Sequence, residues 1–127
     1  MASRRRGSYA LHTLSPSQRF SSREFRTGGG AIANSGTVIL SNATVTLNET
    51  ERGGGGIWSN GSLTLNNSDV TNNQTAGVGG GIMNENALII RTGSLIDANS
   101  AVDGGGIYNW VGGQVTIDAT TISNNEA

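Results

Sequence analysis

A glycine-rich phrase recurs at a constant step of 25 residues along this chain of 127 residues. Each copy ends in an isoleucine that follows two small residues, and these isoleucines are Ile32, Ile57, Ile82 and Ile107. A unit of this length cannot bury its own apolar face, so its copies have to stack along an axis. The period therefore predicts a stacked repeat architecture.

Apolar residues alternate within each copy in the pattern of a short strand. A pair of them follows each isoleucine by six and eight residues, if a two-residue insertion near Gly112 and Gly113 is allowed in the last copy. These pairs are Val38 and Leu40, Leu63 and Leu65, Leu88 and Ile90, and Val115 and Ile117. A third apolar position comes later in each copy, and we assign it to Val45, Val70, Leu95 and Ile122. Glycine, asparagine and serine separate the three predicted strands and suit tight turns.

Three strands in each copy, with no helical pattern, predict an all-β fold. We expect a right-handed, single-stranded parallel β-helix solenoid of about four coils of 25 residues, its hand following the rule for parallel crossovers. The coils are residues 28–52, 53–78, 79–103 and 104–127. Neighbouring coils lie about 4.8 Å apart in such a fold. Because each end exposes backbone groups and a layer of core, we expect either a longer chain or end-to-end self-association.

Charge divides the chain into two segments. Residues 1–27 hold six arginines and one glutamate, a net charge of +5, whereas residues 28–127 hold two arginines and eight acidic groups, a net charge of −6. We interpret residues 1–27 as a basic tail that is disordered, a leader or a cap. A capping helix would begin near residues 15–18 and cover the first coil with Leu11, Leu14, Phe20 and Phe25. Nucleic acid is not an expected partner, because the acidic repeats offer no basic stripe.

Two phrases of the repeats resemble a known family. Residues 29–32 read Gly-Gly-Ala-Ile and are similar to the GGAI phrase of polymorphic outer-membrane protein repeats. Residues 45–48, 70–73 and 122–125 resemble that family's Phe-x-x-Asn phrase with an aliphatic residue in place of phenylalanine, and Asn99 stands one place late in the third copy. More broadly, residues 28–127 resemble pectate-lyase-like right-handed β-helices. The resemblance implies a secreted or surface-exposed passenger of the autotransporter type at a bacterial outer membrane, often an adhesin.

One outward column of side chains is the candidate binding face. Each isoleucine of the glycine-rich phrase points inward, so the residue after it points outward. The resulting column is Ala33, Trp58, Met83 and Tyr108. Trp58 and Tyr108 would lie roughly 10 Å apart, two coils along the axis. Aromatic rings at this spacing can bind a surface glycan or the apolar surface of a host protein; alternatively, a loop or the tail covers the column.

Asparagines recur at two inward positions, where we expect structural ladders. One position holds Asn34, Ser59, Asn84 and Asn109, and the other holds Asn48, Asn73, Asn99 and Asn125. A buried asparagine at a bend can bond to the backbone and to its copy on the next coil. These residues are therefore predicted to stabilise the turns and to bind no ligand.

Nothing in the repeats predicts catalysis, a metal site or a cofactor. The acidic residues do not align on one face, as a glycosidase or lyase site would require. The chain has no cysteine, and its single histidine, His12, lies in the tail. Outward threonine columns are interrupted by an aspartate and isoleucines, which disfavours an ice-binding surface. No stretch is apolar enough to span a bilayer.

We expect a non-catalytic extracellular structural or adhesive segment. The alternative is a β-helix that binds or cleaves polysaccharide with its Trp58 and Tyr108 face.

Overall fold

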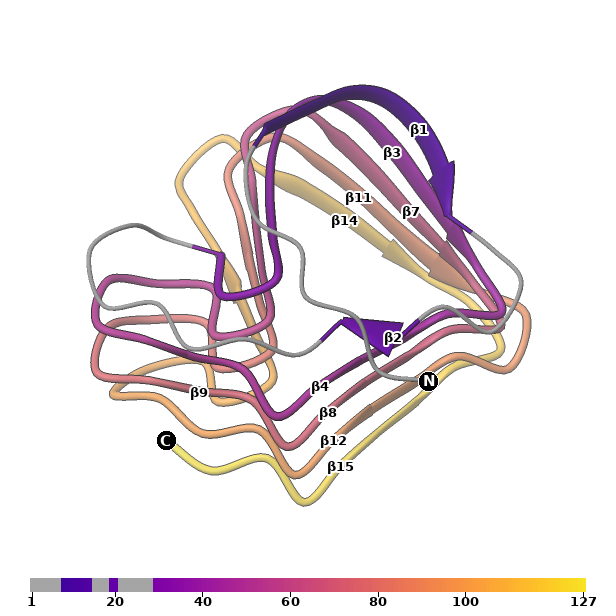
Figure 1. Cartoon of the computed structure of the whole chain (residues 1–127). Helices are drawn as coiled ribbons and strands as arrows, with labels where there is room; N and C mark the ends of the chain where they lie inside the picture. The colour runs from indigo at the N-terminus through magenta and orange to yellow at the C-terminus, as the bar shows by residue number, and fades with distance from the viewer. Residues whose placement is uncertain (1–7, 15–18, 21–28) are drawn as a thin grey trace.

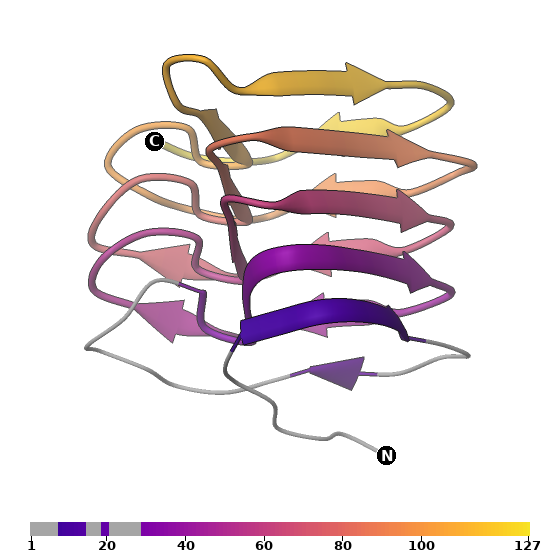
Figure 2. The ribbon, with the colours of Figure 1, turned by 90° about the horizontal axis from the view of Figure 1, so that it is seen from above.

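The computed structural model describes residues 8–14, 19–20 and 29–127, and in these residues the chain is an all-β solenoid of about four coils (Figure 1). The strands of successive coils run parallel and lie above one another (Figure 2). The predicted repeat is confirmed, because Ile32, Ile57, Ile82 and Ile107 are Cα partners in consecutive coils. The described part of the chain has no helix that could cross a membrane.

Three parallel sheets form the walls of the solenoid. The largest has the order β13-β10-β6-β3-β7-β11-β14, with β1 also paired to β3. Its strands are β1 (Ser8–Leu14), β3 (Ile32–Ser41), β6 (Ile57–Ser59), β7 (Ser62–Asn66), β10 (Ile82–Asn84), β11 (Ala87–Arg91), β13 (Ile107–Asn109) and β14 (Gln114–Ile117). The second sheet contains β2 (Arg19–Phe20), β4 (Thr44–Thr46), β8 (Asp69–Thr71), β12 (Leu95–Asp97) and β15 (Thr121–Ser123). The third contains β5 (Glu49–Thr50) and β9 (Gln74–Thr75). In the first coil, β3 spans continuously what later coils divide into two strands.

Apolar columns fill the space between the sheets. Each column takes one residue from every coil, and the coils pack one strand spacing apart, so each side chain contacts its own copies above and below. The buried members are Ile32, Ile57 and Ile82; Val38, Leu63 and Leu88; Leu40, Leu65 and Ile90; and Val45, Val70 and Ile96, with Ala31 and Ala43. Burial of these side chains is the main contribution to stability.

The third-strand assignment in coil three was wrong by one residue. Ile96, not Leu95, is the Cα partner of Val70 and is fully buried. The bend before β12 is one residue longer than in the other coils, because Thr92 and Gly93 both adopt positive φ there, at 62° and 75°. Asn99 consequently follows Ile96 at the same distance as Asn73 follows Val70. The third copy of the asparagine phrase is therefore in register rather than one place late.

The same shift changes the outward columns of this sheet. Leu95 lies beside Asp69, and Asp97 lies beside Thr71, each one residue later than a constant 25-residue step would place it. The two-residue insertion in the fourth coil is confirmed, since Leu88 pairs with Val115. Small insertions are therefore accommodated at bends while the strands keep their pairing.

Two strands lie within the segment that we interpret as a tail. β1 pairs with β3 and β2 pairs with β4, so each of the two larger sheets gains one strand beyond the first coil. Leu11 and Leu14 lie in β1, whose backbone follows β3 with a shift in register between Tyr9 and Leu11. A capping helix that runs through Phe20 is contradicted, because Phe20 lies in β2 and pairs with Val45. The predicted helix start at residues 15–18, and Phe25, lie outside the described residues.

Glycine is required at the bend before each first strand for two reasons. Gly54, Gly79 and Gly104 adopt φ of 62°, 74° and 60°, a region that disfavours a Cβ atom. The next glycine in each copy lies against the neighbouring coil: a Cβ on Gly55 would come within 2.2 Å of the Gly80 carbonyl oxygen. At the recurring phrase, adjacent coils therefore pack too closely to accommodate a side chain.

Candidate functional site

The column predicted to face outward does so on β3, β6, β10 and β13. Ala33, Trp58, Met83 and Tyr108 are consecutive Cα partners, and all four are partly exposed. The Met83 sulphur lies against Gly53, where an added Cβ would come within 2.7 Å of it. Met83 is thus held against the bend beside the column, with Trp58 on one side and Tyr108 on the other.

A second outward column adjoins the first, two residues further along the chain. The parallel ladder continues past the strand ends, with the Glu85 amide donating to the Ser59 carbonyl and the Trp110 amide donating to the Asn84 carbonyl, both at 2.8 Å. Glu85 and Trp110 are therefore stacked on neighbouring coils. The Trp58 indole Nε1 donates a hydrogen bond to the Glu85 carboxylate, joining the two columns across one coil boundary.

The insertion gives the fourth coil a longer loop than the coils before it (Figure 1). The turn closes where the Gly113 amide donates to the Trp110 carbonyl at 2.8 Å, and Gly112 takes φ of 89°. Trp110 is 47% exposed and Val111 is 91% exposed. The rings of Trp110 and Tyr108 are 5.8 Å apart between centroids and tilted by 50°. We call the surface formed by Trp58, Glu85, Tyr108 and Trp110 the aromatic face.

The sequence analysis did not assign Glu85 or Trp110 to a binding face. Both positions follow a strand by one residue and continue its alternation, so each side chain is outward like the residue two places before it. The extra residues after Trp110 were a usable signal, since insertions in repeat proteins often gather on one face. The predicted candidates Trp58, Met83 and Tyr108 lie in one column. The aromatic face combines two of them, Trp58 and Tyr108, with Glu85 and Trp110.

An asparagine ladder runs through all four coils after the second sheet. Side-chain amides of Asn48, Asn73 and Asn99 each donate to the Oδ1 of the next asparagine, ending at Asn125, over 2.8, 3.0 and 2.9 Å. The backbone amides of the same three residues also donate to these oxygens. The Nδ2 of Asn73 donates in addition to the Val45 carbonyl at 3.0 Å. Every rung thus bonds to another coil.

The other inward polar position is a less regular ladder. The Asn34 amide donates to the Ser59 hydroxyl at 3.0 Å, and the Asn84 amide donates to Asn109 Oδ1 at 2.9 Å. Two shorter ladders of hydroxyl groups were not anticipated. In one, the backbone amide of Ala43 donates to Ser68 Oγ at 3.1 Å, and the backbone amide of Ser68 donates to Ser94 Oγ at 3.0 Å. In the other, the Thr50 hydroxyl donates to the Thr75 hydroxyl at 2.9 Å. The sequence signal that could have revealed them is the recurrence of serine or threonine at the coil spacing.

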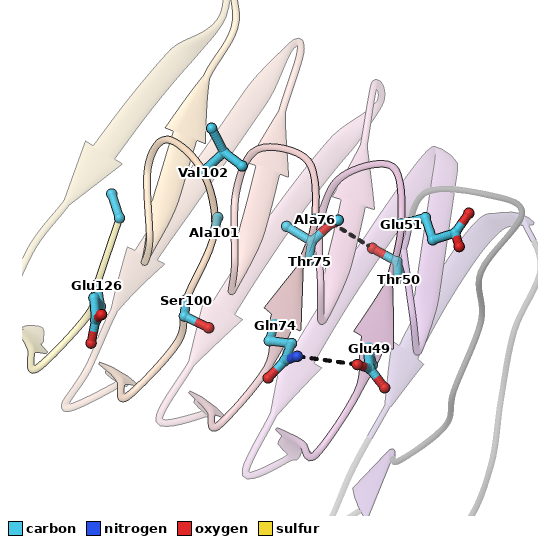
Figure 3. A pocket seen from close by; sticks show the side chains of 11 residues that line it. Glu49, Thr50, Glu51, Gln74, Thr75, Ala76, Ser100, Ala101, Val102 and Glu126 are labelled. Atoms are coloured by element: carbon cyan, nitrogen blue, oxygen red, sulfur yellow. Dashed lines mark hydrogen bonds between the residues drawn. The ribbon is translucent and has the colours of Figure 1, made fainter.

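A hollow of about 470 Å³ lies along the third sheet (Figure 3). One row of its lining is Glu49, Gln74, Ser100 and Glu126, joined in register from coil to coil. The Gln74 amide donates to the Glu49 carboxylate at 3.1 Å. Glu49 and Glu126 are three coils apart, and no group of three metal-ligating side chains occurs in the described parts of the chain. The hollow is an open recess lined by both polar and apolar side chains.

The acidic residues project from different walls of the solenoid. Asp69 and Asp97 belong to the second sheet, whereas Glu85 belongs to the aromatic face. Burial raises the pKa of the Asp69 carboxyl above its usual range. Asp97 accepts hydrogen bonds from the Ser123 hydroxyl and the Asn124 amide, both at 2.8 Å. Glu85 therefore lies on a different wall from Asp69 and Asp97.

No family model, curated protein or solved structure matches the chain in the comparisons.

Proposed function

We propose that this chain is a non-catalytic structural or adhesive segment that is displayed outside the cell or at its surface. The observation that carries this proposal is the asparagine ladder, which joins all four coils through hydrogen bonds of 2.8 to 3.0 Å. A buried, fully bonded polar network of this kind makes the coil spacing uniform and the solenoid rigid. Rigidity is what a stalk, or a platform for binding a partner, requires.

The outer surface supplies the adhesive part of the proposal. Side chains in outward columns are held at the strand spacing of about 4.8 Å, so a partner meets a regular array instead of a flexible loop. The aromatic face is an array that combines rings with a carboxylate. Tyr and Trp provide large contact areas at low entropic cost, which makes them effective anchors for a partner.

Adhesion of the full chain to surfaces tests this proposal. Beads coated with the chain should bind to cells or to immobilised surface proteins, and Trp58→Ser combined with Tyr108→Ser should reduce the bound fraction. Ser62→Ala combined with Gln114→Ala alters exposed positions on β7 and β14 and is the matched control. Equal binding by the double serine variant and by the control would show that adhesion, if present, uses another face.

Polysaccharide binding or cleavage is the second candidate. The register of Trp58 and Tyr108, two coils apart in one column, favours it because sugar rings stack on aromatic side chains at such spacings. The chain would be incubated with a panel of acidic and neutral polysaccharides while new reducing ends and unsaturated products are measured. Turnover that disappears in Glu85→Gln would contradict the non-catalytic proposal; retention on a polysaccharide column without turnover would support a binding module.

A further inference from the structure

We propose that the aromatic face binds an arginine side chain from a basic segment of a partner polypeptide. This inference rests on the proposed adhesive function and names the chemistry of the partner. Three observations support it. The face contains a carboxylate that forms no ion pair with the described residues, its rings are arranged to suit a compact cation, and the surrounding repeats carry a net negative charge.

The carboxylate of Glu85 is the first feature. It is half-buried and accepts the Trp58 indole N–H through Oε2, which fixes its orientation on the surface. Among the described residues no ion pair involves Glu85, and the side chain of Arg91 instead donates to Asn66 on the outer side of β7 and β11. A partly desolvated carboxylate gains most from a cationic donor. A guanidinium can donate to it while the Trp58 bond remains in place.

The rings are the second feature. Trp58 donates its N–H to an anion, which increases the electron density of the indole and so strengthens its attraction for a cation. Tyr108 and Trp110 are tilted by 50° and do not form the flat platform on which a sugar ring would lie. A tilted pair suits a small planar cation that enters edgewise and stacks on one ring. Guanidinium is planar, stacks on aromatic faces and bonds carboxylates, so arginine fits better than lysine.

The charge of the repeats is the third feature. Residues 28–127 hold eight acidic groups and two arginines, so their summed field attracts basic segments and accelerates encounter. This electrostatic attraction alone would hold a basic segment at no defined position on the surface. The aromatic face supplies the local geometry that a specific arginine contact needs.

The test is a titration of the full chain with a synthetic peptide, acetyl-Gly-Arg-Arg-Arg-Gly amide, followed by calorimetry and tryptophan fluorescence. A second peptide carries citrulline, the neutral isostere, in place of every arginine. Arg4, Arg5 and Arg6 of the chain are changed to glutamine in all samples so that this run of three arginines does not compete with the peptide. The variants are Glu85→Gln, which still accepts the Trp58 bond, and Trp110→Leu, which keeps apolar area but removes the ring. Glu126→Gln is the control with the same change in charge.

The proposal predicts binding of the arginine peptide and at least tenfold weaker binding of the citrulline peptide. Glu85→Gln and Trp110→Leu should each weaken binding by about five- to thirtyfold, with less than a twofold effect from Glu126→Gln. Equal losses in Glu85→Gln and Glu126→Gln would overturn it in favour of diffuse attraction. Failure of the arginine peptide to bind, while coated beads still adhere, would overturn the arginine site and leave the adhesive function standing. If the arginine peptide does not bind and the coated beads do not adhere either, the adhesive proposal is contradicted as well.

Discussion

A single interior asparagine bonds in two directions along the solenoid axis. Asn73 Oδ1 accepts from the side chain and the backbone of Asn48, and its Nδ2 donates to Asn99 and to Val45. The glycine beside it, Gly56, leaves space for this amide, since an added Cβ there would come 3.0 Å from the Asn73 Nδ2. Glycine and asparagine are thus complementary positions of one motif.

Replacing one asparagine of the ladder should lower the free energy of unfolding far more than replacing an exposed asparagine. Asn73→Ala removes the acceptor of the Asn48 side-chain and backbone amides and the donor to Asn99 Oδ1 and the Val45 carbonyl, all of them buried. We expect the free energy of unfolding to fall by about 2–4 kcal/mol. Urea unfolding followed by far-ultraviolet circular dichroism measures this change. Asn60→Ala, at an exposed position, is the control. A similar small loss in both variants would show that the ladder is not a source of stability.

Asp69 should make the protein less stable as the pH rises. Its pKa is raised by burial, so the folded state holds the proton more tightly than the unfolded state does. Below the usual aspartate pKa both states are protonated and burial carries no charge penalty; above the raised pKa the folded state has to bury a charged carboxylate. Asp69→Asn should therefore unfold at a higher urea concentration than the natural chain at pH 7.

The stability gain from Asp69→Asn should disappear near pH 3. The Cα partners of Asp69 on the neighbouring coils are Thr44 and Leu95, which offer no cation to reverse the sign. Asp118→Asn, at an exposed position, controls for the loss of one negative charge. A gain that is the same at pH 3 and pH 7 would mean that burial of the charge is not its cause.

At the scale of elements, the bends between strands decide where a coil departs from the average repeat. The bend after the second-sheet strand places Leu47, Asn72, Ala98 and Asn124 at φ between 52° and 60°. Asparagine tolerates this left-handed region better than other non-glycine residues. Two of the four coils therefore carry a residue poorly suited to its backbone conformation.

Leu47→Asn should consequently stabilise the protein. Leu47 is 59% exposed, so little apolar burial is lost, and relief of the strained φ of 60° should raise the free energy of unfolding by about 1 kcal/mol. Thermal and urea unfolding measure the gain. Val111→Asn makes the same kind of exchange at a 91% exposed position without positive φ. An equal effect of the two substitutions would exclude backbone strain as the reason.

The bends also explain where prediction from sequence succeeded and failed. Strand pairing followed from recurrence alone, because an isoleucine every 25 residues allows one register. The third strand of coil three was misplaced because Leu95 and Ile96 are both apolar, so the pattern did not reveal the extra residue at Thr92 and Gly93. Trp110 was missed because it lies one residue beyond the end of β13, where the alternation of the strand was not followed further. Contacts between residues 27 apart, such as Trp58 with Glu85, depend on rotamers that no pattern encodes.

At the scale of the whole molecule, interior and surface are divided by the alternation of each strand. Inward positions hold apolar columns and amide ladders, and outward positions are free to vary from coil to coil. The aromatic face is one result of that freedom, since Ala33 occupies in coil one the place that Trp58 and Tyr108 occupy later. A binding surface can therefore change without any change in the fold.

The measurement that most directly tests this account is the indole N–H resonance of Trp58 in a ¹⁵N-labelled full chain, assigned by its loss in Trp58→Phe. The contact with Glu85 exists only if coils two and three stack in the described register and the aromatic face is assembled. Glu85→Gln should therefore shift this resonance upfield more than it shifts that of Trp110, while Glu126→Gln should move neither. A Trp58 resonance that is unchanged in Glu85→Gln would contradict both the register and the face built upon it.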